Sequence, residues 1–500
     1  IITMKLKFLP LFLSVMPVQQ VMSQGKPNIL FIFADDMTVD ALDAIMSERE
    51  VISPNLDRLR ESGTFFTHAF NQGSWSGAVS AASRAMLTTG RYLWNACNRQ
   101  PDNPNFARQM AQNWPKESKP YVHNFVQQEK YWPQYMSEAG YKTYMTGKWH
   151  VIASPDKVFD VVKHVRGGMP KESMDYYERK FIKGREEVWT PYDKSKGGFW
   201  EGGKHWSEVT CEDALEFIDD AKGQDKPFFM YIAFNAPHDP RQSPKEYIDM
   251  YPADKISIPK SFAPMYPYKD FIGCGPKLRD ANLAPFPRNR YSVQVNRQEY
   301  YALITHLDVQ IGKILDALEK SGKKDNTYIF FTADHGISIG ERGLFGKQNM
   351  YDESVRVPLI VSGPGVKKGK TLHNMVYLQD IMASAMDLAD SKDMDKIDFK
   401  SLMPLAKGET KESRKAIYGG YYGLQRMVRT DRYKMIIYPM INVVRLYDLK
   451  KDPLEMNDIA ADPQNKSLMD NLLLQLKNLQ KEVNDQLDVT LYYNNFFKTL

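Results

Sequence analysis

The sequence predicts an α/β fold in which a large mixed, mostly parallel sheet is sandwiched by helices and followed by a smaller C-terminal antiparallel sheet plus a helix. Three observations support this prediction: apolar runs that end in polar clusters, helical patterns between those runs, and short aromatic strand patterns after residue 413. With 500 residues, of which 43% are hydrophobic, the chain is long enough to bury a large core and a smaller second one.

Three apolar runs, at 28–34, 227–234 and 327–332, are typical of strands buried on both faces of a parallel sheet. Each run is followed at once by polar residues. In open α/β sheets, ligands bind beyond the carboxyl ends of the strands, so these polar residues are expected to share one edge. They are Asp35 and Asp36, the segment 235–238, and Asp334 with His335.

Helical patterns lie between the strands, notably at 210–221 and 299–321, where the apolar residues keep to one face. Residues 391–413 are charged and poor in apolar side chains, so we interpret them as a connecting segment. The main domain is therefore expected over residues 24–390. A C-terminal α+β subdomain is expected over residues 414–500, with strands within 418–438 and at 445–449 and a helix at 467–483.

The N-terminal segment has the order of a secretory signal peptide. Lys5 and Lys7 precede an apolar run at 8–18, and small residues follow around Ser23. We therefore expect residues 1–23 to be a signal peptide and the protein to be exported, either periplasmic or secreted. The apolar run is too short to span a bilayer, so no stable membrane insertion is expected. The alternative is a frayed N-terminal helix.

Charge and cysteine content exclude several functional classes. The formal net charge of +5, from 66 basic and 61 acidic residues, is small for this length and does not favour nucleic-acid binding. It is compatible with a modest preference for anionic substrates. The three cysteines, Cys97, Cys211 and Cys274, have no metal-type spacing and support neither a disulfide framework nor a zinc knuckle.

Two local patterns suggest chemistry. Asp35 and Asp36 would repel each other at a strand end unless a cation or a shared proton relieved them, which favours a hard-cation site; a solvated turn or a helix cap is the alternative. Ser80 stands where a helix can begin, with Arg84 one turn later. This pair suits a nucleophile beside an anion-binding guanidinium, although Ser80 can also serve only as a helix cap.

The combination of motifs, in order, resembles the formylglycine-dependent sulfatases of the alkaline phosphatase superfamily. Ser80, Ala82, Ser83 and Arg84, followed by Thr-Gly-Arg at 89–91, fit the signature of that family in its serine form. The resemblance covers most of the chain. Its other motifs are Gly-Lys-Trp-His at 147–150, Ala-Pro-His-Asp-Pro at 236–240, Thr-Ala-Asp-His-Gly at 332–336, Gly-Lys at 346–347, the segment 347–358, and Leu-Tyr-Asp-Leu at 446–449.

The resemblance implies a cofactor set. A maturase would read the Ser80 segment and convert Ser80 to formylglycine (3-oxoalanine). One divalent cation, calcium by its mainly carboxylate ligands, would be bound by Asp35, Asp36, the modified Ser80, Asp334 and His335. Many relatives have asparagine at the position of His335, and a nitrogen ligand slightly relaxes the preference for a hard cation.

The resemblance also implies catalytic roles. Ser80, once converted and hydrated, would attack sulfur, and its second hydroxyl would later expel sulfate. His238 would be the general acid, with Lys347 beside the bridging oxygen, and His150 would be the base, although the two histidine roles could be exchanged. Arg84 and Lys148 would stabilise the sulfate oxygens.

The expected reaction is the removal of sulfate from a sulfated carbohydrate. Residues 151–204 are rich in Lys, Arg, Tyr and Trp and form a candidate rim for the sugar, with His164 and Arg166 as candidate contacts. Two alternatives remain open: a phosphatase or phosphodiesterase of the same superfamily that uses unmodified Ser80 with two zinc ions, and a catalytically silent protein that binds sulfated glycans.

Overall fold

The structure is a computed structural model that describes residues 25–43, 49–100, 122–125, 130–170 and 174–499. The expected signal peptide, residues 1–23, lies outside the described residues. Across the described residues, no helix is both long and apolar enough to cross a bilayer. The three cysteines are buried and free.

The central feature is a mixed sheet. Three of its adjacent strands run parallel: β11 (Thr327–Ala333), β1 (Asn28–Ala34) and β10 (Phe228–Ala233). All seven residues of β1 are buried, as its continuous apolar sequence predicts. β14 runs antiparallel to both of its neighbours, so the sheet is mixed but mostly parallel, as expected. The strand order is β15 (Lys370–Leu372), β2 (Thr64–Phe70), β14 (Arg356–Ser362), β11 (Thr327–Ala333), β1 (Asn28–Ala34), β10 (Phe228–Ala233), β6 (Lys142–Lys148) and β7 (Val161–Arg166), and β16 (Val376–Tyr377) pairs with β2.

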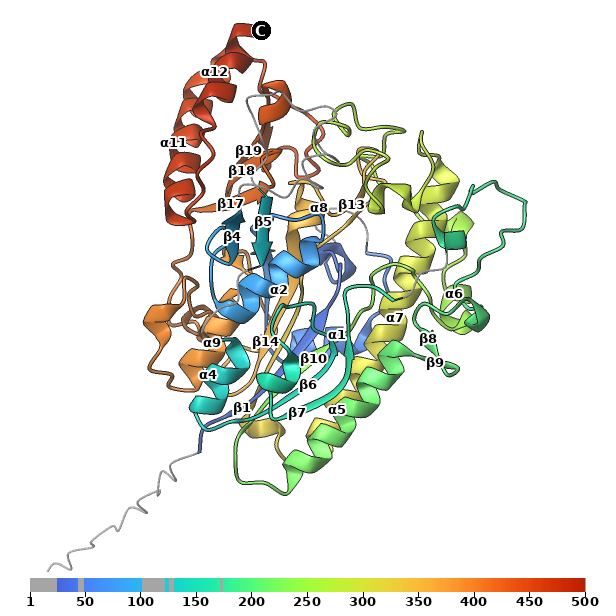
Figure 1. The fold of residues 1–500 in the computed structure, drawn as a ribbon, viewed down its shortest axis with the longest axis vertical. Helices are drawn as coiled ribbons and strands as arrows, with labels where there is room; N and C mark the ends of the chain where they lie inside the picture. Colours follow the sequence, from blue (N-terminus) through green and yellow to red (C-terminus); the bar gives the residue numbers. More distant parts are fainter. Residues whose placement is uncertain (1–24, 44–48, 101–121, 126–129, 171–173, 500) are drawn as a thin grey trace, which may run out of the picture.

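Helices cover the sheet in two groups (Figure 1). α5 (Trp206–Lys222) and α7 (Arg290–Lys320) pack against each other, and α5 also contacts β6 and β10. α2 (Val79–Thr89), α4 (Trp132–Glu138) and α9 (Asp380–Leu388) form the other group and contact one another. α7 begins at Arg290, earlier than the predicted start at 299, and the Asn289 side chain caps it by accepting a hydrogen bond from the Ser292 N–H.

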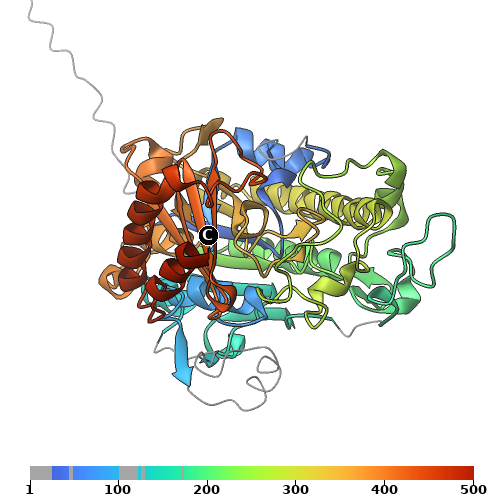
Figure 2. The same cartoon turned by 90° about the horizontal axis from the view of Figure 1, so that it is seen from above.

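A smaller sheet follows near the C-terminus (Figure 2). It contains β17 (Ala416–Tyr421), β18 (Gln425–Thr430), β19 (Tyr433–Tyr438) and β20 (Val443–Asp448) in antiparallel order. α11 (Lys466–Glu482) packs on β17 and β18, and α12 (Thr490–Thr499) packs on β19 and β20. The expected antiparallel sheet with a helix is therefore present, together with a last helix that the sequence reading did not include.

Two short elements of the fold were not predicted from the sequence. β3 (Gly73–Ser74), far earlier in the chain, pairs in parallel with β17 and forms the fifth strand of the smaller sheet. The segment 391–413, interpreted as a connection, contains α10 (Met403–Lys407), in which Met403, Leu405 and Ala406 are buried. Strands and helices this short carry too little periodic pattern to be recognised in a sequence.

A buried ion cluster also connects the two sheets. Asp352, in α8 (Asp352–Val355) of the main domain, accepts hydrogen bonds from Arg429 of β18 at 3.1 Å and from Lys434 of β19 at 2.5 Å. Arg356 lies 3.4 Å from the same carboxylate. Burial alone would raise the pKa of Asp352, but Arg429 and Lys434 hold it well below its usual value.

Replacing Asp352 with Asn should therefore weaken the whole fold. The change leaves buried cations without their counter-charge, so we expect the free energy of unfolding to fall by about 3–5 kcal/mol. Urea unfolding followed by circular dichroism measures this loss. Asp249→Asn is the matched control, because Asp249 forms an exposed pair with Lys245, and its midpoint should not change. Equal midpoints for the two variants would contradict this account.

Candidate active site

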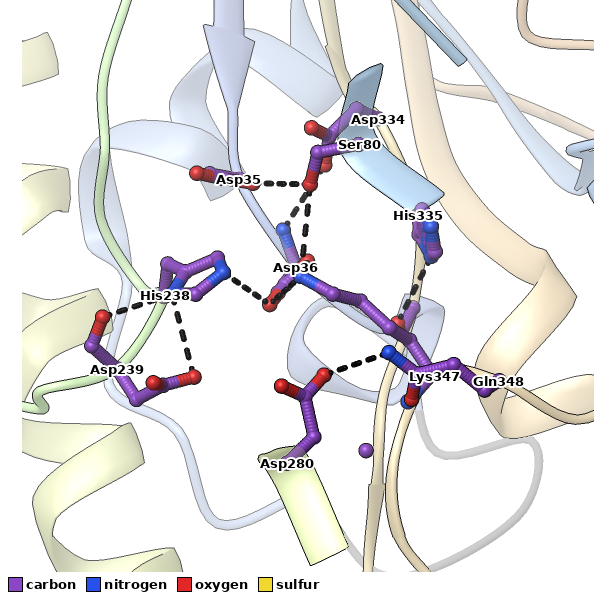
Figure 3. A network of polar contacts seen from close by, with 12 residues as sticks. Asp35, Asp36, Ser80, His238, Asp239, Asp280, Asp334, His335, Lys347 and Gln348 are labelled. Carbon is purple, nitrogen blue, oxygen red and sulfur yellow. Dashed lines mark hydrogen bonds and ion pairs between the residues drawn. The ribbon is translucent and has the colours of Figure 1, made fainter. Parts of the chain in front are cut away.

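The carboxyl ends of four adjacent strands, in the order β11, β1, β10 and β6, meet at one edge of the main sheet. Asp35 and Asp36 follow β1, and Asp334 follows β11. Lys148 ends β6, and His238 lies in the loop after β10. Figure 3 shows side chains that follow β1, β10 and β11 together with Ser80 and Lys347 in one network of polar contacts. The sequence therefore predicted correctly that these clusters share one edge.

Ser80 lies in the first turn of α2, one position after the helix begins at Val79. Its hydroxyl donates a hydrogen bond to Asp35 Oδ1 at 3.1 Å, and Lys347 Nζ lies 3.4 Å from the Ser80 Oγ. The residue before the helix is Ala78, so Ser80 is not the helix cap that the alternative interpretation proposed. The Ser80 side chain is therefore directed at charged groups of the site.

Asp334 is held by its backbone as well as by its carboxylate. Its carbonyl oxygen accepts hydrogen bonds from Asn71 Nδ2 at 2.9 Å and from Ser83 Oγ at 2.8 Å. One carboxylate oxygen accepts from the backbone N–H of Asp36 at 3.1 Å. Asp36 itself has a left-handed backbone with φ of 64°, which is uncommon for a residue other than glycine. The chain is thus bent so that acidic side chains from two strands converge.

Three buried cations offset these acids. Lys148 Nζ contacts Asp35 Oδ2, and Lys347 Nζ donates to both oxygens of Asp36 at 2.7 and 2.6 Å. Arg84 is fully buried, and its Nε donates to Asp334 Oδ2 at 3.0 Å. Its Nη1 donates to the Lys148 carbonyl at 2.7 Å, whereas Nη2 has no hydrogen-bond partner among the described residues.

Burial and neighbouring charges shift the pKa values of all three acids. Burial, followed by the charge of Asp334, raises the pKa of Asp35 to about 6. Burial also raises the pKa of Asp36 well above its usual value despite Lys347. Burial would likewise raise the pKa of Asp334, but Arg84 and Lys148 hold it well below its usual value. A divalent cation among these carboxylates would relieve the repulsion, so the donor set fits a hard ion.

One compact group of possible ligand atoms lies among the described residues, and it differs from the predicted set because it contains His238 and lacks Asp334 and His335. One carboxylate oxygen each from Asp35 and Asp36 and a ring nitrogen of His238 lie within 4.8 Å of one another. His335 is also buried beside Asp334, and its Nε2 has no hydrogen-bond partner in the described part of the chain. Burial lowers the pKa of His335 to about 3, so its ring is neutral near pH 7 and can donate a lone pair.

His150 and His238 flank the acids. His150 follows β6 with φ of 53°, and its Nδ1 has no partner among the described residues. Burial, followed by the charges of Lys148 and Arg84, lowers the pKa of His150 to about 3. His238 is buried, its Nε2 lies 3.5 Å from Asp36 Oδ2, and its pKa is lowered well below normal by burial and Lys347.

The two candidate sugar contacts make other interactions. They lie on β7, a strand inside the segment that was interpreted as a surface rim. His164 Nδ1 lies 2.9 Å from Asp213 of α5. Arg166 lies 2.5 Å from Glu201, and its guanidinium stacks over Trp206, 4.4 Å from the ring centroid. Both side chains are thus engaged with α5 and its preceding hairpin.

Several residues around the site were given no role by the predictions from sequence. Asp239 was quoted in a motif but received no role, and it contacts the His238 ring. Gln348 accepts a hydrogen bond from the Lys347 backbone N–H at 2.9 Å, and its amide donates to Asp280 at 2.9 Å. Each stands next to a predicted site residue, Asp239 after His238 and Gln348 after Lys347, and this adjacency was the signal that the sequence offered.

Comparisons with known proteins identify the family. A family model described as Sulfatase matches residues 27–391, and one described as N-sulphoglucosamine sulphohydrolase, C-terminal, matches residues 340–482. The chain is 26% identical to an N-acetylglucosamine-6-O-sulfatase of Bacteroides thetaiotaomicron, over 92% of this chain and 87% of that protein. It is 27% identical to an arylsulfatase of Clostridium perfringens, over 89% of this chain and 93% of that protein.

Solved structures share the fold at lower identity. A protein solved in complex with its substrate D-glucosamine-2-N,6-O-disulfate aligns with a TM-score of 0.67 and 24% identity, over 92% of this chain and 99% of that chain. A phosphonate monoester hydrolase from Silicibacter pomeroyi aligns with a TM-score of 0.69 and 20% identity, over 92% and 96%. These likenesses concern the fold alone. The family match over residues 27–391 and the named relatives show that this chain belongs to the sulfatase family and is a sulfuric ester hydrolase.

Proposed function

We propose that this chain is a calcium-dependent, serine-type formylglycine sulfatase that removes sulfate from a sulfated carbohydrate. The observation that carries the proposal is the position of Ser80, which is 3% exposed in the first turn of α2 and directed at Asp35 and Lys347. Relatives of the chain named as an N-acetylglucosamine-6-O-sulfatase and as ulvan-active sulfatases support the choice of carbohydrate.

The proposed modification converts Ser80 to formylglycine, the product of a maturase that acts on the Ser80 segment. When hydrated, this group supplies two hydroxyls on one carbon, one for attack on sulfur and one for the later release of sulfate. A serine hydroxyl alone supplies only the first. Asp35 Oδ1, which accepts the hydrogen bond of the Ser80 hydroxyl at 3.1 Å, would orient the attacking oxygen.

The proposed ion is calcium, bound by Asp35, Asp36, Asp334 and His335 together with the converted residue 80. A bound divalent cation makes a hydroxyl in its coordination shell easier to deprotonate. Oxygen atoms dominate this ligand set, and His335 contributes a neutral ring because burial lowers its pKa to about 3.

The cations of the chain would bind the sulfate group. Arg84 is already fixed by Asp334 and by the Lys148 carbonyl, which leaves Nη2 for a sulfate oxygen. Lys148 would contribute a second charge, and Lys347 would lie beside the bridging oxygen. Because these groups are ordered before substrate arrives, little reorganisation is needed as charge develops in the transition state.

The two histidines would move protons. His238 would donate a proton to the leaving alcohol, and His150 would accept one when sulfate is released. The pKa of His150, lowered to about 3, keeps its ring neutral near pH 7, which suits a base. We further propose export of the protein through the signal peptide at residues 1–23, because glycan substrates of this kind are extracellular polymers.

Conversion of Ser80 can be tested directly. In protein matured in a host with a serine-accepting maturase, the peptide that contains Ser80 should be lighter by the mass of two hydrogen atoms. Ser80→Ala should lower kcat at least about 10³-fold, since it removes the nucleophile. Ser467→Ala, at an exposed serine on α11 outside the candidate sugar rim, is the control and should retain full activity. Undiminished activity of Ser80→Ala would refute the proposed nucleophile.

Removal of calcium should inactivate the enzyme and lower its melting temperature. A chelator withdraws the charge that relieves repulsion among the buried acids, so activity and thermal stability should both return with added Ca²⁺. In Asp334→Asn, the Ca²⁺-dependent rise in melting temperature should be lost. Restoration by Zn²⁺ but not by Ca²⁺ would contradict the proposed ion.

Substrate class is tested with a panel of sulfated monosaccharides and matched phosphate monoesters. We expect kcat/KM for at least one sugar sulfate to exceed that for the corresponding sugar phosphate by at least about 10²-fold, because the site is built for one divalent cation and three basic side chains. A preference for the phosphate ester would support the phosphatase alternative instead. Tight binding of the sugar sulfate without turnover would support the silent binding protein.

A further inference from the structure

His238 is fixed mainly by the residue that follows it. Its Nδ1 lies 2.7 Å from the Asp239 backbone carbonyl, a contact that requires Nδ1 to carry a hydrogen. Asp239 Oδ1 lies 3.2 Å from the same nitrogen as an ion-pair contact, and this oxygen has no hydrogen-bond partner among the described residues. With Nδ1 held in this way, Nε2 is the ring atom left to face the reaction centre, as Figure 3 shows.

Asp239 is in turn held by Tyr177 and Arg279. The Tyr177 hydroxyl donates to Asp239 Oδ2 at 2.5 Å, and Arg279 Nη2 lies 3.5 Å from the same oxygen. Asp239 is 1% exposed, yet Arg279 and Lys347 outweigh its burial and keep its pKa below the usual value. It is thus a buried, ionised carboxylate with one oxygen bound by Tyr177 and the other facing His238.

Tyr177 is not on a loosely attached loop. The side chain of Arg179, two residues later, is 6% exposed and donates to Glu299 of α7 at 2.9 Å. Its guanidinium also lies 4.9 Å from the ring centroid of Trp189. The ion pair attaches this segment to α7, the longest helix among the described residues, and so the Tyr177 hydroxyl is held in place before substrate binds.

We propose that Asp239 is a positioning residue for the sulfatase reaction, and that Tyr177 holds its carboxylate so that the His238 ring presents Nε2 to the leaving oxygen. The inference rests on the proposed function, because it assumes that His238 protonates the leaving group. In that step the S–O bond breaks, its electron pair passes to the bridging oxygen, and this oxygen takes the Nε2 proton of a His238 ring that carries hydrogens on both nitrogens. The neutral ring that remains keeps its Nδ1 hydrogen, donated to the Asp239 backbone carbonyl and facing the Asp239 carboxylate.

This arrangement has a distinctive kinetic consequence. A sugar alkoxide is a poor leaving group and depends on proton donation, whereas 4-nitrophenolate leaves readily without it. Loss of the Asp239 carboxylate should therefore slow sugar sulfates much more than 4-nitrophenyl sulfate. A general distortion of the site would slow both substrates alike.

The experiment compares kcat for a sugar sulfate and for 4-nitrophenyl sulfate in the matured, calcium-loaded full chain. Asp239→Asn keeps the size of the side chain and should lower kcat for the sugar sulfate by about 10²-fold, and that for the aryl sulfate by less than about threefold. Tyr177→Phe should show the same selectivity with a loss of about tenfold. Tyr176→Phe is the matched control, because its buried hydroxyl has no hydrogen-bond partner among the described residues, and neither rate should change.

Several outcomes would overturn the inference. Equal losses for both substrates would make Asp239 a structural residue, and losses that excess Ca²⁺ restores would place its effect on ion binding. Should Asp239→Asn fail to fold, as judged by circular dichroism, Tyr177→Phe provides the same comparison.

Failure of the proposed function is recognised separately. In that case the wild-type chain hydrolyses neither ester, or Ser80→Ala remains active. Nitrogen-15 NMR of the histidine rings then still tests the geometry without any turnover. The His238 signal, assigned by its loss in His238→Gln, should report a hydrogen on Nδ1, and a hydrogen on Nε2 alone would contradict the proposed orientation.

Discussion

The architecture of the site depends on the balance of charge at the carboxyl ends of the parallel strands. Asp35, Asp36 and Asp334 are fully buried there, and their mutual repulsion would be prohibitive without Arg84, Lys148 and Lys347. The cations come from a helix, a strand and a distant loop, so the balance is reached only when these elements have assembled. The charged side chains of the candidate site therefore also help to hold the folded core of this sulfatase together.

The same balance suits an oxyanionic substrate. A sulfate ester in the site would meet a guanidinium and ammonium groups that the acids already hold in place. The acids in turn fit a divalent cation, because burial and the charge of Asp334 disfavour the ionised form of Asp35, which a cation would favour. The sulfate would thus be bound by the basic side chains and the cation by the acidic ones.

The sequence was sufficient for the parts of the structure that have strong local signals. The apolar run at 28–34 predicted β1 and the position of Asp35 and Asp36, and the Ser80 motif predicted a helix beginning there. Contacts between distant residues left no such signal. Tyr177 meets Asp239 across 62 positions, and β3 joins β17 through only two residues. His164 was predicted as a sugar contact in a surface rim; it lies on β7, its side chain is 55% exposed, and the contact with Asp213 could not be predicted from the sequence.

The two-residue strand β3 has a practical consequence for how the protein can be divided. It belongs to the smaller sheet but leads directly into α2, and the Tyr422 hydroxyl accepts a hydrogen bond from the Gly77 backbone at 2.6 Å. A truncated chain that ends near residue 413 would expose β3 as an unpaired edge and remove the support of the turn before Ser80. The smaller sheet thus supports the turn before Ser80, and we expect that it cannot be removed or replaced as an independent domain.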